Sequence, residues 1–284
     1  MKTVLTKDTV IERSRSLPAF PTIINKILTT LDDVEANLNL LAAEIQHDPV
    51  IAARVLSRAN SAATRTRRLS TVRDIYAATS LIGVDMVREM VMICSLGNLV
   101  YGAVPAEMSS TFWQHSVAVG VCSEELALHT AARVSAPAAL IAGLLHDIGQ
   151  LWLYRFDVEA YHIAWKRALS DAIGIEEAER EQFGVDHSTI GVWLAEHWTL
   201  PAAIVASINY HHAPDAALDE PLVPLVHVAE VLSNALDLTG RNENRVTSLS
   251  SSACEKLGLI WDKNIHPLFG RMEARSRHAN ALFK

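Results

Sequence analysis

Residues that begin and end helices recur roughly every 12–20 positions along this chain of 284 residues, close to the usual length of a helix. Asp48-Pro49 and Ser135-Ala-Pro137 each combine a capping side chain with a proline in the first turn. Ser70 is placed to cap a helix over residues 71–82, which Gly83 would end. Strand-like alternation of β-branched residues is rare, so the sequence predicts an all-α fold.

The length suits one large domain or two small ones, and the composition suits a globular protein. Half of the residues are apolar, which is enough to bury a large core and excludes global disorder. The net charge of −7 argues against a protein that coats nucleic acid over its whole surface. Apolar runs such as Met90–Leu96 and Ala138–Leu145 are shorter than the roughly 18 residues that cross a bilayer, so no membrane insertion is expected.

The first segment and the cysteines indicate the compartment. Charged residues such as Lys7 and Asp8 interrupt any apolar core of a secretory signal. Cys94, Cys122 and Cys254 are odd in number and widely spaced, which predicts neither a disulfide framework nor a paired-cysteine zinc site. We therefore expect a protein of the reducing cytoplasm.

His146 and Asp147 directly follow the apolar run Ala138–Leu145, within a segment expected to be helical as far as Leu153. Two ionisable groups in this position are costly unless a partner satisfies them. Neutral imidazole and carboxylate are standard metal ligands, so a metal ion is one such partner. For an isolated pair, the simpler interpretation is a histidine that bonds to the backbone at the end of a helix.

The pair is not isolated, because the chain has 12 histidines and several lie near the predicted ends of other helices. Adjacent histidines on a helix point about 100° apart, so His211 and His212 would suit two neighbouring ions, or one ion and a substrate. His227 and Glu230 are three residues apart and share a helix face. The candidate ligands are His115, His146, Asp147, His187, His211, His212 and Glu230.

Such a set would suit a dinuclear hydrolase, in which two metals hold the attacking and leaving oxygens. We expect the side chains of His115, His146 and Asp147 to come within about 5 Å of a common point. The alternative for any single histidine is an ordinary core or surface residue.

Residues 49–73 carry six arginines and no acidic residue, a local asymmetry in an acidic chain. These arginines could face the phosphates of a nucleotide or nucleic acid, or an acidic protein. No interleaved aromatic residues strengthen the nucleic-acid interpretation, and a solvated surface is the simpler alternative. The candidates are Arg54, Arg58, Arg65, Arg67, Arg68 and Arg73, of which Arg65, Arg67 and Arg68 are expected to be largely exposed.

The order His115, His146-Asp147, Glu230 resembles the HD superfamily of metal-dependent phosphohydrolases, whose pattern is His, His-Asp and a distant Asp. His187 and His211-His212 resemble the branch that cleaves cyclic di-nucleotides, HD-GYP. The sequence departs from this branch because Gln150 stands in place of its Lys, no Gly-Tyr-Pro follows His212, and the last carboxylate is a Glu. We expect these changes to affect metal binding less than catalysis.

Further motifs occur along both halves of the chain. They are Leu17-Pro18-Ala-Phe-Pro21, His47-Asp48-Pro49, Arg58-Ala-Asn60-Ser61, Leu81-Ile-Gly83, Phe112-Trp113-Gln-His115, Gly143-Leu-Leu-His146-Asp147-Ile-Gly149 and His187 to Pro201. In this order they closely resemble the HDOD family, the HD-related output domain. The resemblance covers about residues 17–236.

This resemblance implies a two-lobed, all-α HDOD fold with an HD-like helical bundle in the C-terminal lobe. Gly102 and Pro105 mark the seam between the lobes. The expected parts are a helical arm at 1–16, an HDOD domain at 17–236 with lobes 17–104 and 105–236, and a loop with a helical tail at 237–284.

The family implies an output module of bacterial signalling proteins, so the leading expectation is a non-catalytic or weakly catalytic module that relays a signal to signalling proteins. The alternative is a metal-dependent phosphohydrolase acting on a phosphoester or nucleotide, with one or two divalent ions of iron, manganese or zinc. Asp147 would then be the candidate catalytic residue, bridging the ions or orienting water. A second alternative is a nucleotide or nucleic-acid sensor that uses the Arg54–Arg73 segment. No glycine-rich phosphate loop is present, so no nucleotide cofactor is expected.

Overall fold

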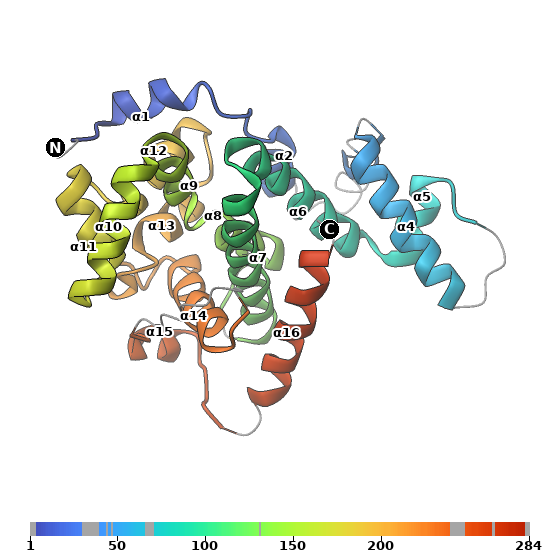
Figure 1. The fold of residues 1–284 in the computed structure, drawn as a ribbon. Helices are drawn as coiled ribbons and strands as arrows, with labels where there is room; N and C mark the ends of the chain where they lie inside the picture. The colour runs from blue at the N-terminus through green and yellow to red at the C-terminus, as the bar shows by residue number, and fades with distance from the viewer. Residues whose placement is uncertain are drawn as a thin grey trace. The chain divides into compact units, whose positions relative to one another are not determined.

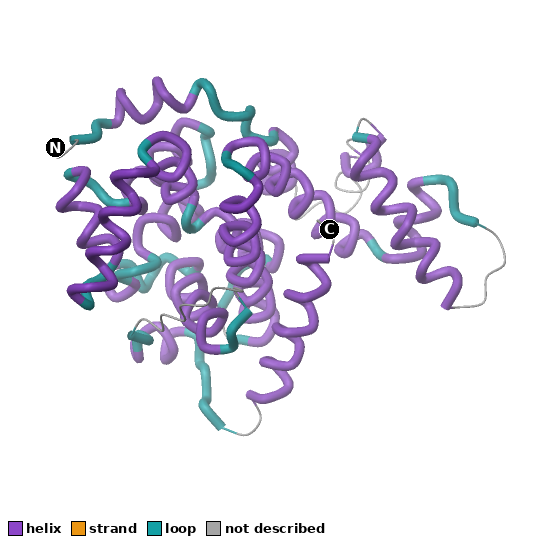
Figure 2. Tube along the Cα trace, in the orientation of Figure 1, coloured by secondary structure: helices purple, strands orange, loops and turns teal. Residues whose placement is uncertain are grey.

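The computed structural model describes residues 4–29, 40–43, 45–46, 48–65, 71–130, 132–238, 248–262 and 265–281. Every regular element within these ranges is a helix, which confirms the all-α prediction (Figure 2). The chain divides into two compact units, Met1–Phe20 with Leu99–Arg277, and Pro21–Asn98 with His278–Lys284. Helices α6 (Val84–Ala103) and α16 (His266–Ala281) contribute residues to both units.

The smaller unit contains α2 (Thr22–Thr29), α4 (Pro49–Arg65), α5 (Ile75–Ile82) and most of α6. Helix α4 begins as predicted, because Asp48 Oδ1 accepts hydrogen bonds from the backbone N–H groups of Val50 and Ile51 at 2.9 and 3.1 Å.

The start of α5 differs from the prediction, because Asp74 rather than Ser70 caps this helix. Asn60 explains the later start: its side chain donates to the carbonyl oxygen of Val72 at 3.0 Å and accepts from the N–H of Val72 at 2.8 Å. These side-chain bonds replace the helical bonds that Val72 would otherwise make. Ser70 itself lies outside the described residues. Gly83 follows the last turn of α5 with a φ of 89°, as its predicted role as a helix stop requires.

The larger unit is built around α7, which packs along α8 and α14 (Figure 1). A Cβ on Gly143 of α8 would lie 2.7 Å from the Cα of Gly120 on α7, so only glycines allow this close approach of the two helices. The unit contains α1 (Lys7–Ser14), α7 (Ala106–His129), α8 (Ala136–Leu145), α9 (Ile148–Phe156), α10 (Val158–Asp171), α11 (Ile175–Phe183), α12 (His187–His197), α13 (Ala202–Tyr210), a short 3-10 turn (Pro214–Ala216), α14 (Leu222–Ala235) and α15 (Ser251–Lys256).

The helix predicted over residues 138–153 is interrupted at His146 and Asp147, and the chain forms α8 and α9 instead. Asp147 has a φ of −101° and a ψ of 17°, outside the usual helical range. The turn lets α9 pack against the beginning of α12, where a Cβ on Gly149 would lie 1.9 Å from the carbonyl oxygen of His187. The interruption therefore brings Asp147 and His187 into the same place.

The segment Ala136–Phe156 also corrects the expectation that no stretch is long enough to cross a membrane. It spans 21 residues and is apolar enough by length and composition. However, 83% of its apolar window is buried inside the protein, and His146 and Asp147 interrupt it. This burial is typical of a core helix.

The N-terminal arm packs on the helices that follow the His146-Asp147 turn. Helix α1 lies against α12, and Ser14 accepts a hydrogen bond from Trp152 Nε1 on α9 at 2.9 Å. Arg13 forms an ion pair with Asp157 at 2.6 Å, just after α9. The arm thus fixes α9 and α12 from outside.

The predicted tail contains two helices, α15 and α16. On α16, Arg271 and Arg275 donate to the buried carboxylate of Glu125 on α7, at 3.1 and 2.8 Å. These bonds fasten the tail to the same helix that carries His115. Much of the loop expected at the beginning of the 237–284 segment lies outside the described residues, because residues 239–247 are not described.

Candidate metal centre

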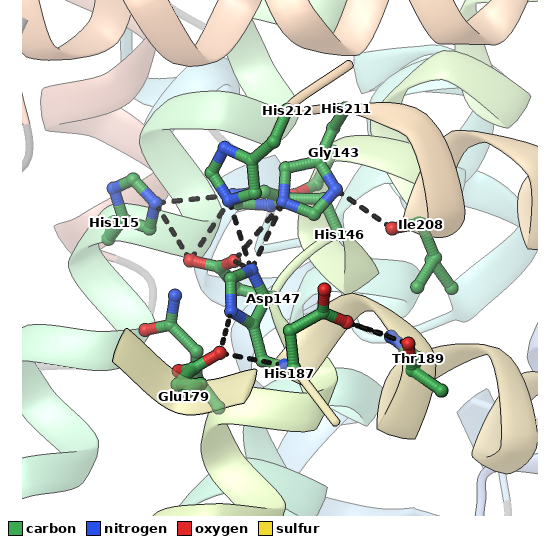
Figure 3. A network of polar contacts seen from close by, with 12 residues as sticks. His115, Gly143, His146, Asp147, Glu179, His187, Thr189, Ile208, His211 and His212 are labelled. Atoms are coloured by element: carbon green, nitrogen blue, oxygen red, sulfur yellow. Dashed lines mark hydrogen bonds and ion pairs between the residues drawn. The ribbon is translucent and has the colours of Figure 1, made fainter. Parts of the chain in front are cut away.

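His146 occupies the end of α8 and is fully buried. Its ring Nδ1 lies 2.8 Å from the carbonyl oxygen of Gly143, so Nδ1 carries the hydrogen and donates it. The Nε2 atom therefore keeps a lone pair, and it faces the interior of the cluster (Figure 3). The backbone hydrogen bond expected of a histidine at a helix end is therefore present. This bond also orients the ring so that Nε2 can bind a metal ion, so the structural role and the ligand role are compatible.

Asp147 lies between two sets of histidines (Figure 3). Its Oδ2 atom is 3.3 Å from His115 Nε2 and 3.4 Å from His146 Nε2. Its Oδ1 atom is 3.4 Å from His187 Nε2 and 3.6 Å from His211 Nε2. One carboxylate thus faces two ligand sets from its two oxygens, which is the position of a bridging ligand.

The first ligand set consists of His115, His146 and Asp147, whose donor atoms lie within 4.8 Å of one another. The Nε2 atoms of His115 and His146 are 3.2 Å apart. The predicted convergence of these three side chains is therefore present in the structure.

The second ligand set consists of Asp147, His187, His211 and His212, which meet the same distance limit. His187 Nε2 lies 3.4 Å from His211 Nε2 and 3.0 Å from His212 Nε2. His211 donates from Nδ1 to the carbonyl oxygen of Ile208 at 2.8 Å, which leaves its Nε2 lone pair directed at the cluster.

Glu230 and His227 have different environments although they share a face of α14. Glu230 groups with His146 and His211 as a third set of donors. His227 donates from Nδ1 to the carbonyl oxygen of His211 at 2.7 Å and accepts at Nε2 from the N–H of Ser250 at 3.0 Å. Both ring nitrogens of His227 therefore form hydrogen bonds with the backbone. His227 supports the centre by these bonds and has no nitrogen left to bind a metal ion.

Glu179 on α11 is a residue of this site that the sequence motifs do not reveal. It is fully buried, and its Oε2 atom accepts from His187 Nδ1 at 2.6 Å and from the His187 backbone N–H at 2.8 Å. Carboxylates commonly orient metal-binding histidines in this way. The sequence signal that could have identified Glu179 is its position with Ala178 and Phe183 on the buried face of a short amphipathic helix.

The spacing of the donors fits metal ions. Two ligands that each lie about 2.0–2.2 Å from one ion, at tetrahedral or octahedral angles, are separated by about 3.0–3.5 Å. The Nε2 pairs of His115 with His146, and of His187 with His212, fall in this range at 3.2 and 3.0 Å. Within the described residues, Asp147 Oδ1 is buried and has no hydrogen-bond partner, so it is available to a cation. The residues present therefore fit one or two divalent ions.

The charge states also favour a cation. Burial lowers the pKa of His146 to about 3, and burial together with His211 and His187 lowers that of His212 well below its ordinary value. Burial alone would raise the pKa of Asp147, but the surrounding histidines, His146 first, hold it well below its usual range. Neutral imidazole and ionised carboxylate are the forms that bind metal.

The pKa of His187 differs from those of His146 and His212 because Glu179 lies beside its ring. Burial by itself would lower the pKa of His187, but the Glu179 carboxylate raises it to about 10. A proton on this ring is thus held tightly in the metal-free protein. Metal binding at Nε2 must displace that proton.

Access to the centre is restricted. His115, His146, Asp147, His187 and His211 are all buried, whereas His212 is half-buried. A cavity of about 160 Å³ lies at His212, between α11 and the beginning of α12. Sites for drug-sized ligands enclose about 300–1,000 Å³, so this cavity suits water and small ions.

Gln150 lies on α9 beside the centre and is also buried. Its Oε1 atom accepts a hydrogen bond from the Tyr161 hydroxyl at 3.0 Å. The side chain is neutral and is held by α10, so it brings no positive charge to the reacting region.

The arginine segment is only partly described. Arg54 and Arg58 on α4 are half-buried, and Arg73 is exposed. Arg54 Nη1 lies 3.6 Å from Cys94 Sγ. Arg67, Arg68 and the side chain of Arg65 lie outside the described residues, so their exposure stays a prediction.

The HDOD domain family matches residues 17–214 of the chain. An HDOD domain protein of unknown function from Geobacter sulfurreducens has a similar structure, with a TM-score of 0.75 and 23% identity over 97% of this chain and 96% of that one. A provisionally described signal transduction protein from Marinobacter aquaeolei gives a TM-score of 0.69 at 22% identity, over 99% and 61% of the two chains.

Two further comparisons show similar relationships. A provisionally described phosphohydrolase from Shewanella amazonensis gives a TM-score of 0.64 at 22% identity, over 94% of this chain and 97% of that one. An uncharacterized protein from Treponema pallidum is 23% identical over 80% of this chain and 44% of its own length. The chain therefore spans less than half of that relative. Each structural likeness shows the same fold.

Proposed function

Because the chain belongs to the HDOD family, we propose that it is a bacterial signal-relay module of the cytoplasm, with signalling proteins as partners. In this proposal its HD-like lobe holds two divalent metal ions, and it hydrolyses phosphoesters weakly or not at all. The ligands are His115, His146 and Asp147 for one ion and Asp147, His187, His211 and His212 for the other, with Glu230 at the boundary.

The observation that carries this proposal is the Asp147 carboxylate, buried between two sets of histidines that lie 3.3–3.6 Å from its oxygens. Burial of these ionisable side chains without a cation would cost much free energy. Once loaded, it would join α7, the α8–α9 turn, α12 and α13 through shared ligands. The metal state would thereby control the rigidity of the lobe, which is a property that a partner protein can read.

Weak turnover follows from the surroundings of the same cluster. Hydrolysis needs an open coordination position and positive charge where the transition state becomes anionic. The cavity of about 160 Å³ at His212 is too small for a nucleotide, and Gln150 is neutral. Loss of one group that stabilises the charge of the transition state commonly lowers the rate on the order of 100- to 1,000-fold.

The second candidate is a metal-dependent phosphohydrolase. The specific observation in its favour is that every ligand position expected from the HD pattern is filled and brought together. Two ions sharing a carboxylate can hold the attacking and leaving oxygens of a phosphoester, and Asp147 would orient the attacking water. Use of the Arg54–Arg73 segment by a nucleotide or nucleic acid stays a further alternative.

One experiment separates the two candidates. The protein is purified without chelator, its metal content is measured, and it is then loaded separately with iron, manganese and zinc. Each form is incubated with a cyclic di-nucleotide and with a generic phosphodiester. We expect bound metal with little or no turnover. Robust turnover that disappears in His146→Ala and Asp147→Ala would contradict the relay proposal and establish the hydrolase.

A further inference from the structure

We propose that the two ligand sets exchange their ions at very different rates, with the second set loading and emptying through the cavity at His212. This inference rests on the proposed function, because it requires that the cluster binds two ions. It makes the second position responsive to the free concentration of a divalent cation, while the first position stays filled. The module would then relay metal availability itself.

The two sets differ in their exposure. All three members of the first set are inaccessible: His115 and Asp147 are each 1% exposed and His146 is 0% exposed. In the second set, His187 and His211 are also 0% exposed, but His212 is half-buried and lines the cavity. An ion at the second position therefore has a route to solvent beside one of its own ligands.

The rings also differ in how they are held. His146, His187 and His211 each donate from Nδ1 to a fixed acceptor, namely Gly143 O, Glu179 Oε2 and Ile208 O. For His212, the hydrogen-bond contact found within the described residues is the one from Nε2 to His187 Nε2. Outer partners of this kind commonly contribute about 10- to 100-fold to metal affinity. Within the second set, His212 is therefore the ligand that releases most easily.

The cavity wall favours cations over phosphate. It is lined by the carboxylates of Glu176 and Asp186 and by one guanidinium, Arg180. Arg180 pairs with Asp186 at 2.5 Å. Two carboxylates against one guanidinium leave the wall with a net negative charge. A volume of about 160 Å³ holds several water molecules, so a partly hydrated ion can pass.

The mouth of the cavity offers a residue for a direct test. Asn209 is exposed, lies on α13 and lines the cavity without belonging to any of the ligand sets. Asn209→Phe places a bulky ring at this opening. Ala202→Phe is the matched control, because Ala202 is exposed on the same helix and does not line the cavity.

The experiment measures zinc release from the fully loaded protein to a coloured chelator by stopped-flow absorbance, with the stoichiometry of bound zinc determined beforehand. We expect two zinc ions per chain and two release phases that differ by about tenfold or more, given the loss of one outer-shell contact at His212. Asn209→Phe should slow the fast phase severalfold and leave the slow phase and the stoichiometry unchanged. Ala202→Phe should change neither phase. His212→Ala should abolish the fast phase and leave one ion bound.

The outcomes are distinguishable. Absence of bound zinc would refute the proposed function and this inference together. Release of two bound ions in a single phase would overturn the exchange route alone. The same conclusion would follow if Asn209→Phe and Ala202→Phe slowed the fast phase equally, or if neither slowed it. Asn209→Tyr repeats the test if circular dichroism shows that Asn209→Phe does not fold.

Discussion

His187 Nδ1 and Glu179 Oε2 lie 2.6 Å apart, and both side chains are completely buried. The same carboxylate oxygen also accepts the backbone N–H of His187, so Glu179 fixes both the ring and the first residue of α12. A ligand of the second set therefore depends on a residue of α11 that makes no contact with the proposed ion.

Glu179→Gln should weaken metal binding at the second position. The amide can still accept a hydrogen bond, but it removes the charge that makes the imidazole a stronger donor, and such changes typically cost about 10- to 100-fold in affinity. Competition titration with a zinc indicator measures this loss. Glu177→Gln is the control, because Glu177 is exposed on the same helix. Equal affinities for the two variants would show that Glu179 is only structural.

Gly149→Ala should damage both stability and the metal site. The new Cβ would lie 1.9 Å from the carbonyl oxygen of His187, and backbone cannot move away as a flexible side chain can. We expect a loss of about 1–3 kcal/mol or more in the free energy of unfolding. Thermal and urea unfolding measure it.

Gly270→Ala is the matched control for that substitution. Gly270 lies within α16, and a Cβ there would have no heavy atom of the described residues within 4 Å. The substitution should leave stability unchanged or raise it by about 0.5–1 kcal/mol, because alanine loses less backbone entropy in a helix. Equal destabilisation by both glycine substitutions would contradict the close packing of α9 on α12.

His227→Gln and Glu230→Gln should separate two residues that share one face of α14. Loss of His227 leaves the carbonyl oxygen of His211 and the N–H of Ser250 poorly satisfied, which costs about 1–3 kcal/mol of stability. The number of bound ions should not change. Glu230→Gln should weaken metal binding with a smaller effect on unfolding of the metal-free protein. Reduced metal stoichiometry in His227→Gln would contradict this assignment.

Glu125 should make the stability of the larger unit depend on pH. Burial alone would raise the pKa of Glu125, but Arg275 and Arg271 hold it below its usual range. A carboxyl group whose folded pKa is lowered stabilises the fold above its unfolded pKa of about 4.3, and this contribution is lost as the pH falls through the folded value.

Glu125→Gln should therefore be less stable than the wild type at pH 7, by about 1 kcal/mol because both guanidiniums stay partly exposed. The difference should shrink as the pH falls below about 4.3. Urea unfolding at several pH values measures this. A difference that does not change with pH would assign the effect to packing alone.

The sequence revealed those parts of the fold and site that depend on local signals. Asp48 caps α4 as its position before a proline predicts, and the histidine pattern pointed to the five histidines that group with Asp147 among the described residues. The start of α5 was not predictable, because the pairing of Asn60 with Val72 is a contact between separate segments. The interruption at His146 was predicted only in part. A histidine at a helix end was one interpretation, but the apolar pattern continues on both sides and favoured a helix as far as Leu153.

Glu179 and the difference between His227 and Glu230 needed the tertiary structure. Helical periodicity places His227 and Glu230 on one face, but it does not show that the His227 ring is occupied by Ser250 and His211. In the same way, a glutamate eight residues before His187 carries no motif. Its role appears only when α11 packs beside the start of α12.

In the proposed metal centre, two metal ions share the Asp147 carboxylate. The most direct measurement is a crystal structure of the zinc-loaded protein with an anomalous difference map. We expect two peaks about 3.5–4 Å apart, with Asp147 between them. One peak should lie beside His115 and His146, and the other beside His187, His211 and His212. A single peak, or peaks that Asp147 does not contact, would contradict it.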